Sequence, residues 1–246
     1  MKLRYGVAVS TVEQLQELPA LPKVDFLEIA SALPEHPDFA VPSFWQKRLR
    51  RATGRSEART LGSLIDAGGS IRQEFFRVFG AQCRKFAGYG IGEISLGIDW
   101  ETVFHDPDYA SALRDILRTC YGIAVKNGLT ALLEVRIPGI GAGQAMEFIK
   151  FRNSLLLPVR TLIDLHPHEP GALDMLAVFS GQLPFESSKF RISVDVSGGN
   201  YLSEQLLHRI KESLHKSGAE VPELCFYPGK NADKTAYEQF NMVSGS

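Results

Sequence analysis

The chain has 246 residues, of which 44% are hydrophobic, and its 27 basic residues nearly balance its 28 acidic residues. A chain of this length forms one large domain or two small ones, and its apolar content excludes a disordered or fibrous protein. The formal net charge of −1 argues against a dedicated nucleic-acid binder, which usually carries a clear basic excess.

The sequence also bears on location. It contains no run of about 18 apolar residues, so we expect no membrane span. The apolar run from Tyr5 to Val9 is too short for the core of a signal peptide. The three cysteines, Cys83, Cys120 and Cys225, are too scattered for a disulfide framework. We therefore expect reduced, mostly buried thiols in a cytoplasmic protein.

Runs of β-branched residues alternate along the chain with stretches of helical apolar spacing. In chain order, the first half predicts a strand at 3–10, a helix at 11–18, a strand at 24–30, a helix at 43–51, a weak strand at 60–65, a helix at 70–89 and a strand at 90–98. The second half predicts a helix at 109–127, a strand at 130–137, a helix at 145–157, a strand at 159–165, a helix at 171–179, a strand at 190–196, a helix at 202–216, a strand at 223–227 and one or two helical turns near 235–240.

Eight strands that recur about every 30 residues have the size and rhythm of a (β/α)8 TIM barrel. We therefore predict an α/β protein whose residues 1–246 form a single barrel domain, with a short C-terminal tail from about 229. A doubly wound open sheet is the alternative. Such sheets often carry a glycine-rich phosphate turn after the first strand, and the segment from Ser10 to Val12 has no glycine.

The C-terminal ends of barrel strands build the active site, so polar residues there are the candidates for chemistry. The densest cluster is IDLHPHEPG at 163–171, in which Asp164, His166 and His168 would project to one face of a strand. Pro167 predicts that the strand ends near His166. Imidazole and carboxylate together suit Zn, Mn, Fe or Co. The alternative is that Asp164 and His166 bond to each other and to the backbone without a metal.

Two further carboxylates lie in apolar strands. A buried carboxylate such as Glu134 is costly unless it is paired or metal-bound, and Arg136 lies on the same face of the strand. The two residues form either an internal ion pair, or a ligand or base together with a cation that binds an anionic substrate group. Asp195 lies opposite the apolar side chains of its strand, which predicts that it faces the interior as a ligand or as an internal polar group.

Other polar segments have weaker patterns. The turn SGGN, with Ser197, Gly198 and Asn200, follows the seventh strand, where many barrels bind phosphate on backbone N–H groups; an ordinary turn is the alternative. Glu28 lies between apolar neighbours and could orient a site or pair with Arg4. The segment 46–59 holds six basic residues, which we interpret as a solvated helix face because a nucleic-acid patch would need interleaved aromatic residues.

Three strand motifs, FLEI with Glu28, LLEV with Glu134 and LIDLHPH with Asp164 and His166, carry a family resemblance. With the strand order of nearly the whole chain, they make it similar to the xylose-isomerase-like TIM-barrel superfamily, as a divergent member of the sugar phosphate isomerase/epimerase type. The resemblance implies a divalent metal on a strand-five Glu, a strand-six Asp, a strand-seven His and a strand-eight Glu. Glu134 and Asp164 match the first two positions.

The chain departs from that pattern at the last two positions. Strand seven offers Asp195 in place of His, and the eighth strand, ELCFY, has no carboxylate at its end to act as the second base of an epimerase. His166 or His168 could restore the lost imidazole from the neighbouring strand. Lys230 or His166 could replace the missing base; the alternative is a degenerate site.

The resulting hypothesis is an enzyme that isomerises or epimerises a small polyhydroxy or sugar-phosphate substrate with a divalent metal (Mn, Zn, Mg or Co). Its metal ligands would be Glu134, Asp164, His166 and Asp195, and Glu134 or His166 would move the proton. The substrate-binding residues would be Arg136, Lys230, Ser197, Gly198 and Asn200. The alternatives are a metal-free barrel that acts as a binding module and a metal-dependent phosphoesterase. We expect a small-molecule partner and no nucleic acid or membrane, and the sequence is compatible with a homo-oligomer.

Overall fold

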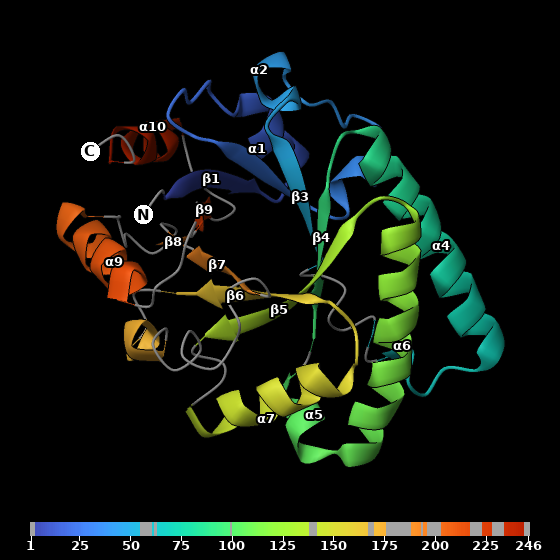
Figure 1. The fold of residues 1–246 in the computed structure, drawn as a ribbon. Coiled ribbons are helices and arrows are strands. Elements are labelled where there is room, and N and C mark those ends of the chain that lie inside the picture. Colours follow the sequence, from blue (N-terminus) through green and yellow to red (C-terminus); the bar gives the residue numbers. More distant parts are fainter. Residues whose placement is uncertain are drawn as a thin grey trace.

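The computed structural model of the chain describes residues 3–54, 61, 63–98, 100–137, 142–166, 170–175, 188–192, 194–195, 203–216, 223–227 and 234–243. One curled parallel sheet runs through its centre (Figure 1). Its strands are β1 (Arg4–Val9), β2 (Phe26–Ala30), β3 (Leu49–Gly54), β4 (Glu93–Gly97), β5 (Thr130–Ile137), β6 (Arg160–Leu165), β7 (Ser188–Ile192), β8 (Val194–Asp195) and β9 (Glu223–Tyr227). The strand order is β1-β2-β3-β4-β5-β6-β7-β9-β8, and β1 also pairs with β9, so the hydrogen bonding returns to the first strand.

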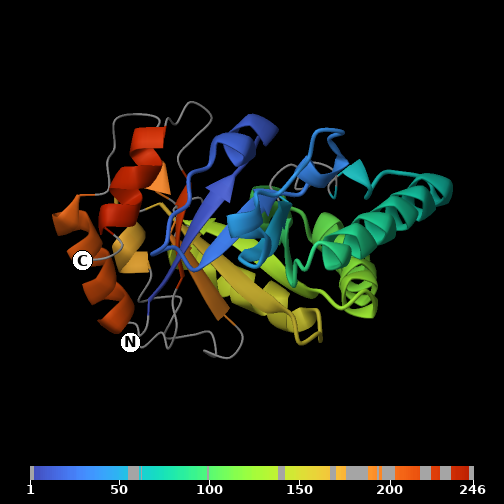
Figure 2. The same cartoon turned by 90° about the horizontal axis from the view of Figure 1, so that it is seen from above.

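Helices surround the strands on the outside (Figure 1). They are α1 (Val12–Glu17), the short 3-10 helix η1 (Leu33–Glu35), α2 (Ser43–Gln46), α4 (Gly69–Gly88), α5 (Trp100–His105), α6 (Pro107–Lys126), α7 (Ala142–Ser154), α9 (Glu204–Lys216) and α10 (Lys234–Val243), with a helical turn at 172–175. Figure 2 shows α4 and α6 together at one end of the molecule and α9 and α10 at the other. This alternation of parallel strands and outer helices confirms the predicted α/β class.

The α6 helix illustrates how local sequence sets the elements. Asp106 caps its N-terminus, since the Asp106 Oδ1 accepts hydrogen bonds from the N–H groups of Asp108 and Tyr109 at 2.9 and 3.0 Å. Pro107 occupies the first turn, where a missing N–H costs nothing. The chain leaves the helix through Gly128, whose φ of +79° favours glycine. Capping, turn chemistry and an apolar stripe thus agree on one helix, which was predicted at 109–127.

Side chains of the strands alternate between two apolar environments. Val7 and Val9 belong to the large core between the strands and the outer helices, whereas Ala8 between them packs with Phe26 and Cys225 in a small separate cluster. The Phe26 ring passes over Gly6, where a Cβ atom would lie 2.2 Å from the Phe26 Cζ. Only glycine fits there, and the ring fills the space enclosed by β1, β2 and β9.

The third strand is the main error of the sequence prediction. Helix α2 begins at Ser43 as expected, but it ends at Gln46, and β3 covers Leu49–Gly54, part of which was predicted as helix. The predicted strand at 60–65 is wrong, because residues 61 and 63 are helical and 64–65 form a turn. Apolar alternation did not mark β3 because its inward-facing residue Arg51 is charged, while Ala52 enters the outer core.

Smaller predictions are confirmed or shifted. Cys83, Cys120 and Cys225 are buried and none of them is in a disulfide, which agrees with the predicted reduced, buried thiols. The predicted seventh strand at 190–196 corresponds to β7 and β8, and α5 was not predicted. Within the described residues, no helix is both long and apolar enough to cross a bilayer.

Candidate functional site

Glu134 lies near the C-terminal end of β5 and turns toward the neighbouring strand β4. Its side chain is buried, and its Oε2 accepts a hydrogen bond of 2.7 Å from the hydroxyl of Ser95, which has no exposed surface. A hydrogen bond to a carboxylate favours its charged form. Ser95 thus offsets part of the cost of burying Glu134, and the sequence analysis did not identify it.

Trp100 binds the backbone of Glu134 from outside the sheet. Its indole N–H donates to the carbonyl oxygen of Glu134 at 2.9 Å. The ring packs edge-on against Phe148 and Phe151 of α7, with centroids 4.7 and 5.5 Å away. Glu134 is therefore held both at its carboxylate and at its main chain by residues that follow or belong to β4.

Asp164 and His166 lie together at the end of β6, as predicted. Asp164 is 1% exposed, and its Oδ2 lies 3.4 Å from the Nε2 of His166. That nitrogen is buried and has no hydrogen-bond partner within the described part of the chain. The expected alternative, a hydrogen bond between the two side chains, is therefore not formed at this nitrogen.

The donor pair at β6 fits a divalent metal. Two ligands that each lie about 2.1 Å from one tetrahedral metal are separated by roughly 3.4 Å, and the Asp164 Oδ2 and His166 Nε2 have this separation. A buried imidazole nitrogen without a hydrogen-bond partner is also costly unless something binds it.

A larger ligand set is not assembled by the described residues. Within them, no three His, Cys, Asp or Glu side chains lie close enough together to hold a metal ion. Sheet register explains this result, because Asp164 is aligned with Arg136 and not with Glu134, and the Glu134 carboxylate is bonded on the β4 side.

The other predicted site residues are only partly described. Arg136 follows Glu134 on the same face and is exposed. Asp195 ends β8 and is aligned with Tyr227 of β9, and its side chain lies outside the described residues. Ser197, Gly198, Asn200, Lys230 and His168 also lie outside them, so their predicted roles stay predictions.

Glu28 belongs to a different cluster, at the opposite ends of the strands. Its Oε2 accepts a bond of 3.0 Å from Arg51, whose guanidinium is completely buried. Arg51 also donates to Glu93 at 2.8 Å and to Glu223 at 2.5 Å, and Arg50 lies 3.4 and 3.3 Å from the same two carboxylates. Five charged residues from four strands thus form one internal network.

This network overturns the interpretation of segment 46–59 as a solvated helix face, since Arg51 lies inside the sheet. Burial alone would lower the pKa of Arg51, but the charges of Glu223, Glu28 and Glu93 outweigh it and raise the pKa above its ordinary value. Arg51 is therefore always charged. Glu223, the carboxylate of the last strand, is part of this network at the beginning of β9, which leaves Tyr227 at the C-terminal end of that strand.

No family model and no curated protein sequence matches the chain. Solved structures do. The xylose isomerase domain protein of Alicyclobacillus acidocaldarius subsp. acidocaldarius has a TM-score of 0.62 at 15% identity, over 99% of this chain and 96% of that chain. The D-psicose 3-epimerase of Clostridium cellulolyticum H10, crystallised with D-tagatose, has a TM-score of 0.58 at 14% identity, over 98% and 96%.

A structure with another chemistry matches almost as well. A GH18 chitinase from Pseudoalteromonas aurantia has a TM-score of 0.55 at 8% identity, over 98% of this chain and 99% of that chain. At such identities the likeness concerns the fold, which hosts many reactions. The chain therefore shares the TIM-barrel-like α/β fold of these xylose isomerase domain and epimerase structures.

Proposed function

We propose that this chain is a sugar isomerase/epimerase-like enzyme that acts on a small polyhydroxy or sugar-phosphate substrate. One observation carries the proposal. Two buried carboxylates, Glu134 and Asp164, stand at the C-terminal ends of adjacent parallel strands, beside the unbonded Nε2 of His166. The solved epimerase and xylose isomerase domain structures that share the fold support the same class.

The fold behind this proposal is a complete (β/α)8 barrel in a single domain. Its support is the pairing of β1 with β9, together with the pairing of both β7 and β8 to β9 as two parts of a seventh strand. In such a barrel the C-terminal strand ends form one mouth, where Glu134 and Asp164 would share the substrate site.

A divalent metal fits the Asp164–His166 pair, and Glu134 and Asp195 are the proposed further ligands. When bound, it would polarise a substrate carbonyl and the adjacent hydroxyl. Glu134 is proposed to remove a proton from the substrate carbon, since the Ser95 hydroxyl holds its carboxylate in a fixed position near the end of β5. The protonated Glu134 would return this proton to the product carbon, and His166 would act in its place only if its Nε2 is not bound to the metal. The exposed Arg136 would bind an anionic group of the substrate.

Metal content tests the ligand assignment without an assay of turnover. Chelator-free protein incubated with Mn or Zn should retain about one ion per chain, and Asp164→Asn should lose it because the amide is a weaker ligand of the same size. Circular dichroism would check that the variant is folded. An equal metal content in both proteins would remove Asp164 from the site.

Solvent exchange tests the reaction class. An isomerase or epimerase that removes a carbon-bound proton incorporates deuterium into a ketose or aldose incubated in D2O. We expect incorporation with the native chain and none with Glu134→Gln, which keeps the acceptor for Ser95. Phosphate release from sugar phosphates without deuterium incorporation would instead indicate the phosphoesterase. Tight sugar binding with neither activity would indicate a binding module.

A further inference from the structure

A cavity opens at the N-terminal ends of the strands, on the opposite side of the sheet from Glu134 and Asp164. Its volume is about 380 Å³, which lies in the range of small-molecule sites. The charged residues that line it are Arg4, Asp25, Lys47, Arg48, Arg50 and Glu93. Four cations therefore face two carboxylates.

Both carboxylates of the lining are already engaged. Asp25 Oδ2 accepts a hydrogen bond of 2.9 Å from the N–H of Tyr5. Glu93 accepts from Arg51 at 2.8 Å and lies 3.4 Å from Arg50. Arg50 uses only its Nη2 for Glu93 and Glu223, at long distances of 3.4 and 3.3 Å. Its other donors make no hydrogen bond to the described residues. With four cations and two engaged carboxylates in the lining, the excess charge of the cavity is positive.

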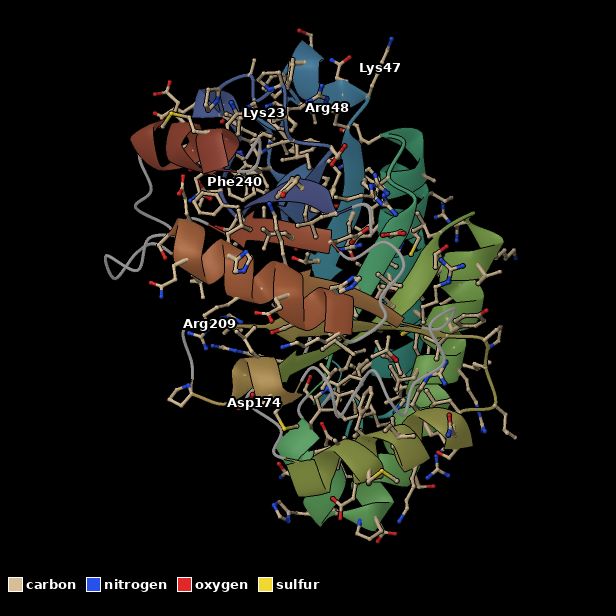
Figure 3. The ribbon with its side chains drawn as sticks, turned by 60° about the vertical axis from the view of Figure 1, so that its left-hand side comes forward. Lys23, Lys47, Arg48, Asp174, Arg209 and Phe240 are labelled. Carbon is tan, nitrogen blue, oxygen red and sulfur yellow. The ribbon has the colours of Figure 1, made fainter. Side chains whose placement is uncertain are left out.

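The ring of Phe26 contacts two of the arginines that line the cavity. The guanidinium carbons of Arg4 and Arg50 lie 5.7 and 5.8 Å from the centroid of the buried Phe26 ring. Cation–π attraction of this kind orients both planar groups before a ligand arrives. Lys47 and Arg48 immediately precede β3 and also line the cavity; Figure 3 labels their side chains. A third guanidinium, that of Arg51, lies 5.8 Å from the same centroid but is bonded to three carboxylates, so Arg4 and Arg50 are the two that line the cavity. Their planar N–H donors match the oxygens of a phosphate better than any neutral group.

We propose that this cavity binds a phosphate group, either free or carried by a small metabolite, between Arg4 and Arg50. The site is separate from the proposed sugar site. Thr130, which lines the cavity, and Glu134 are four residues apart on β5, which is about 13 Å along a strand. Failure of the proposed enzyme activity would therefore leave this inference standing.

Gly92 offers a matched pair of variants. It lines the cavity, and a Cβ atom there would meet nothing within 4 Å. Its N–H donates to the carbonyl of Arg50 and its carbonyl accepts from Thr130, and a side chain disturbs neither bond. Gly92→Asp adds a negative charge to the cavity, while Gly92→Asn adds the same shape without the charge.

Inorganic phosphate is the probe, titrated at constant ionic strength against sodium chloride, with amide NMR shifts as the readout. We expect phosphate to move the amide signals of Gly90, Gly92 and Thr130 in the native chain. Gly92→Asp should bind phosphate at least tenfold more weakly, and Gly92→Asn within about twofold of the native chain. Tighter binding of glycerol phosphate than of inorganic phosphate would show that the site recognises a phosphate ester. Equal binding of the two would favour the free anion as the ligand.

Two results would overturn the proposal. One is the absence of any shift at these amides up to tens of millimolar phosphate, or shifts confined to the C-terminal ends of the strands. The other is equal weakening in Gly92→Asp and Gly92→Asn, because charge would then play no part. Thermal melts of both variants without phosphate would show that they are folded.

Discussion

At the N-terminal ends of the strands, three buried carboxylates share two arginines, whereas at the C-terminal ends Glu134 accepts a bond from a neutral serine and Asp164 lies beside a histidine. Both groups are buried in the same sheet and come from the same kind of sequence, a single Glu or Asp among apolar residues. The difference lies in the charge of the partner.

The charge of the partner distinguishes carboxylates with a structural role from carboxylates that can take part in a reaction. A carboxylate matched by a buried arginine is fixed in charge and position, which suits it to hold strands together. A carboxylate that accepts from a hydroxyl can still bind a cation or exchange a proton with a substrate. The N-terminal face of a barrel is also where polar residues generally serve stability.

Removing the central cation should produce the largest effect. Arg51→Ala removes the guanidinium that bonds to the buried Glu28, Glu93 and Glu223, while Arg50 still lies near Glu93 and Glu223. We expect a loss of about 3–5 kcal/mol in the free energy of unfolding, measured by urea denaturation. Arg51→Lys keeps the positive charge but not the planar guanidinium that reaches three carboxylates. Its free energy of unfolding should therefore fall less than that of Arg51→Ala. Native stability in Arg51→Ala would show that the network contributes nothing.

A pair of isosteric substitutions would compare the two ends directly. Glu28→Gln removes a charge-assisted bond to Arg51, and we expect a loss of about 1–3 kcal/mol. Glu134→Gln keeps an acceptor for Ser95, so its stability should stay within about 0.5 kcal/mol of the native chain. Urea denaturation of both variants measures the difference. Equal losses would mean that the two carboxylates serve the same structural role.

Ser95→Ala would sharpen the C-terminal side of the comparison, and it rests on the proposed function. Because the Ser95 hydroxyl holds the Glu134 carboxylate through a hydrogen bond of 2.7 Å, its loss should leave that carboxylate less well positioned for proton removal. We expect about a tenfold lower rate of deuterium incorporation, carried by kcat while the KM for the sugar changes little. Ser154→Ala, which removes a serine hydroxyl bonded to Phe151 in α7, is the control. A native rate of deuterium incorporation in Ser95→Ala would exclude Ser95 as a positioning residue.

The sequence predicted the positions of the polar residues at the C-terminal ends of the strands better than those at the N-terminal ends. Asp164 and His166 were found because both lie in one short segment at a strand end, where periodicity gives their common face. The Arg51 network was missed because its members are 23, 42 and 172 residues from Arg51 along the chain. No local pattern brings such residues together; sheet closure does.

Strand β3 and Ser95 were missed for related physical reasons. A strand that turns Arg51 inward lacks the alternation that marks a half-buried strand, and RRATG reads as a basic helix end. Ser95 is uncharged, and a single serine in an apolar strand is not by itself a sign of a functional site. The available signal was Glu134 itself, since a buried carboxylate requires a donor on a neighbouring strand.

The smallest expected effect on stability concerns Tyr237 of α10, a helix that belongs to neither of the two groups of carboxylates. Burial, with smaller contributions from Tyr227 and Glu17, raises the pKa of its hydroxyl above the ordinary value. A raised pKa favours the neutral form in the folded chain, so this contribution to stability is complete below pH of about 10 and is lost as the pH rises above it. The hydroxyl is buried and has no hydrogen-bond partner in the described part of the chain.

Tyr237→Phe should therefore be neutral or slightly stabilising at pH 7, by up to about 1 kcal/mol, because it removes a buried polar group that has no hydrogen-bond partner. Between pH 9 and 11 its melting temperature should fall less than that of the native chain, since phenylalanine cannot ionise. Tyr89→Phe, at an exposed tyrosine, is the control. An equal fall of the melting temperature with pH in Tyr237→Phe and the native chain would show that ionisation of Tyr237 does not set the alkaline stability of the fold. The packing of α10 would then rest on its rings, such as Phe240 against Tyr5 and Phe226.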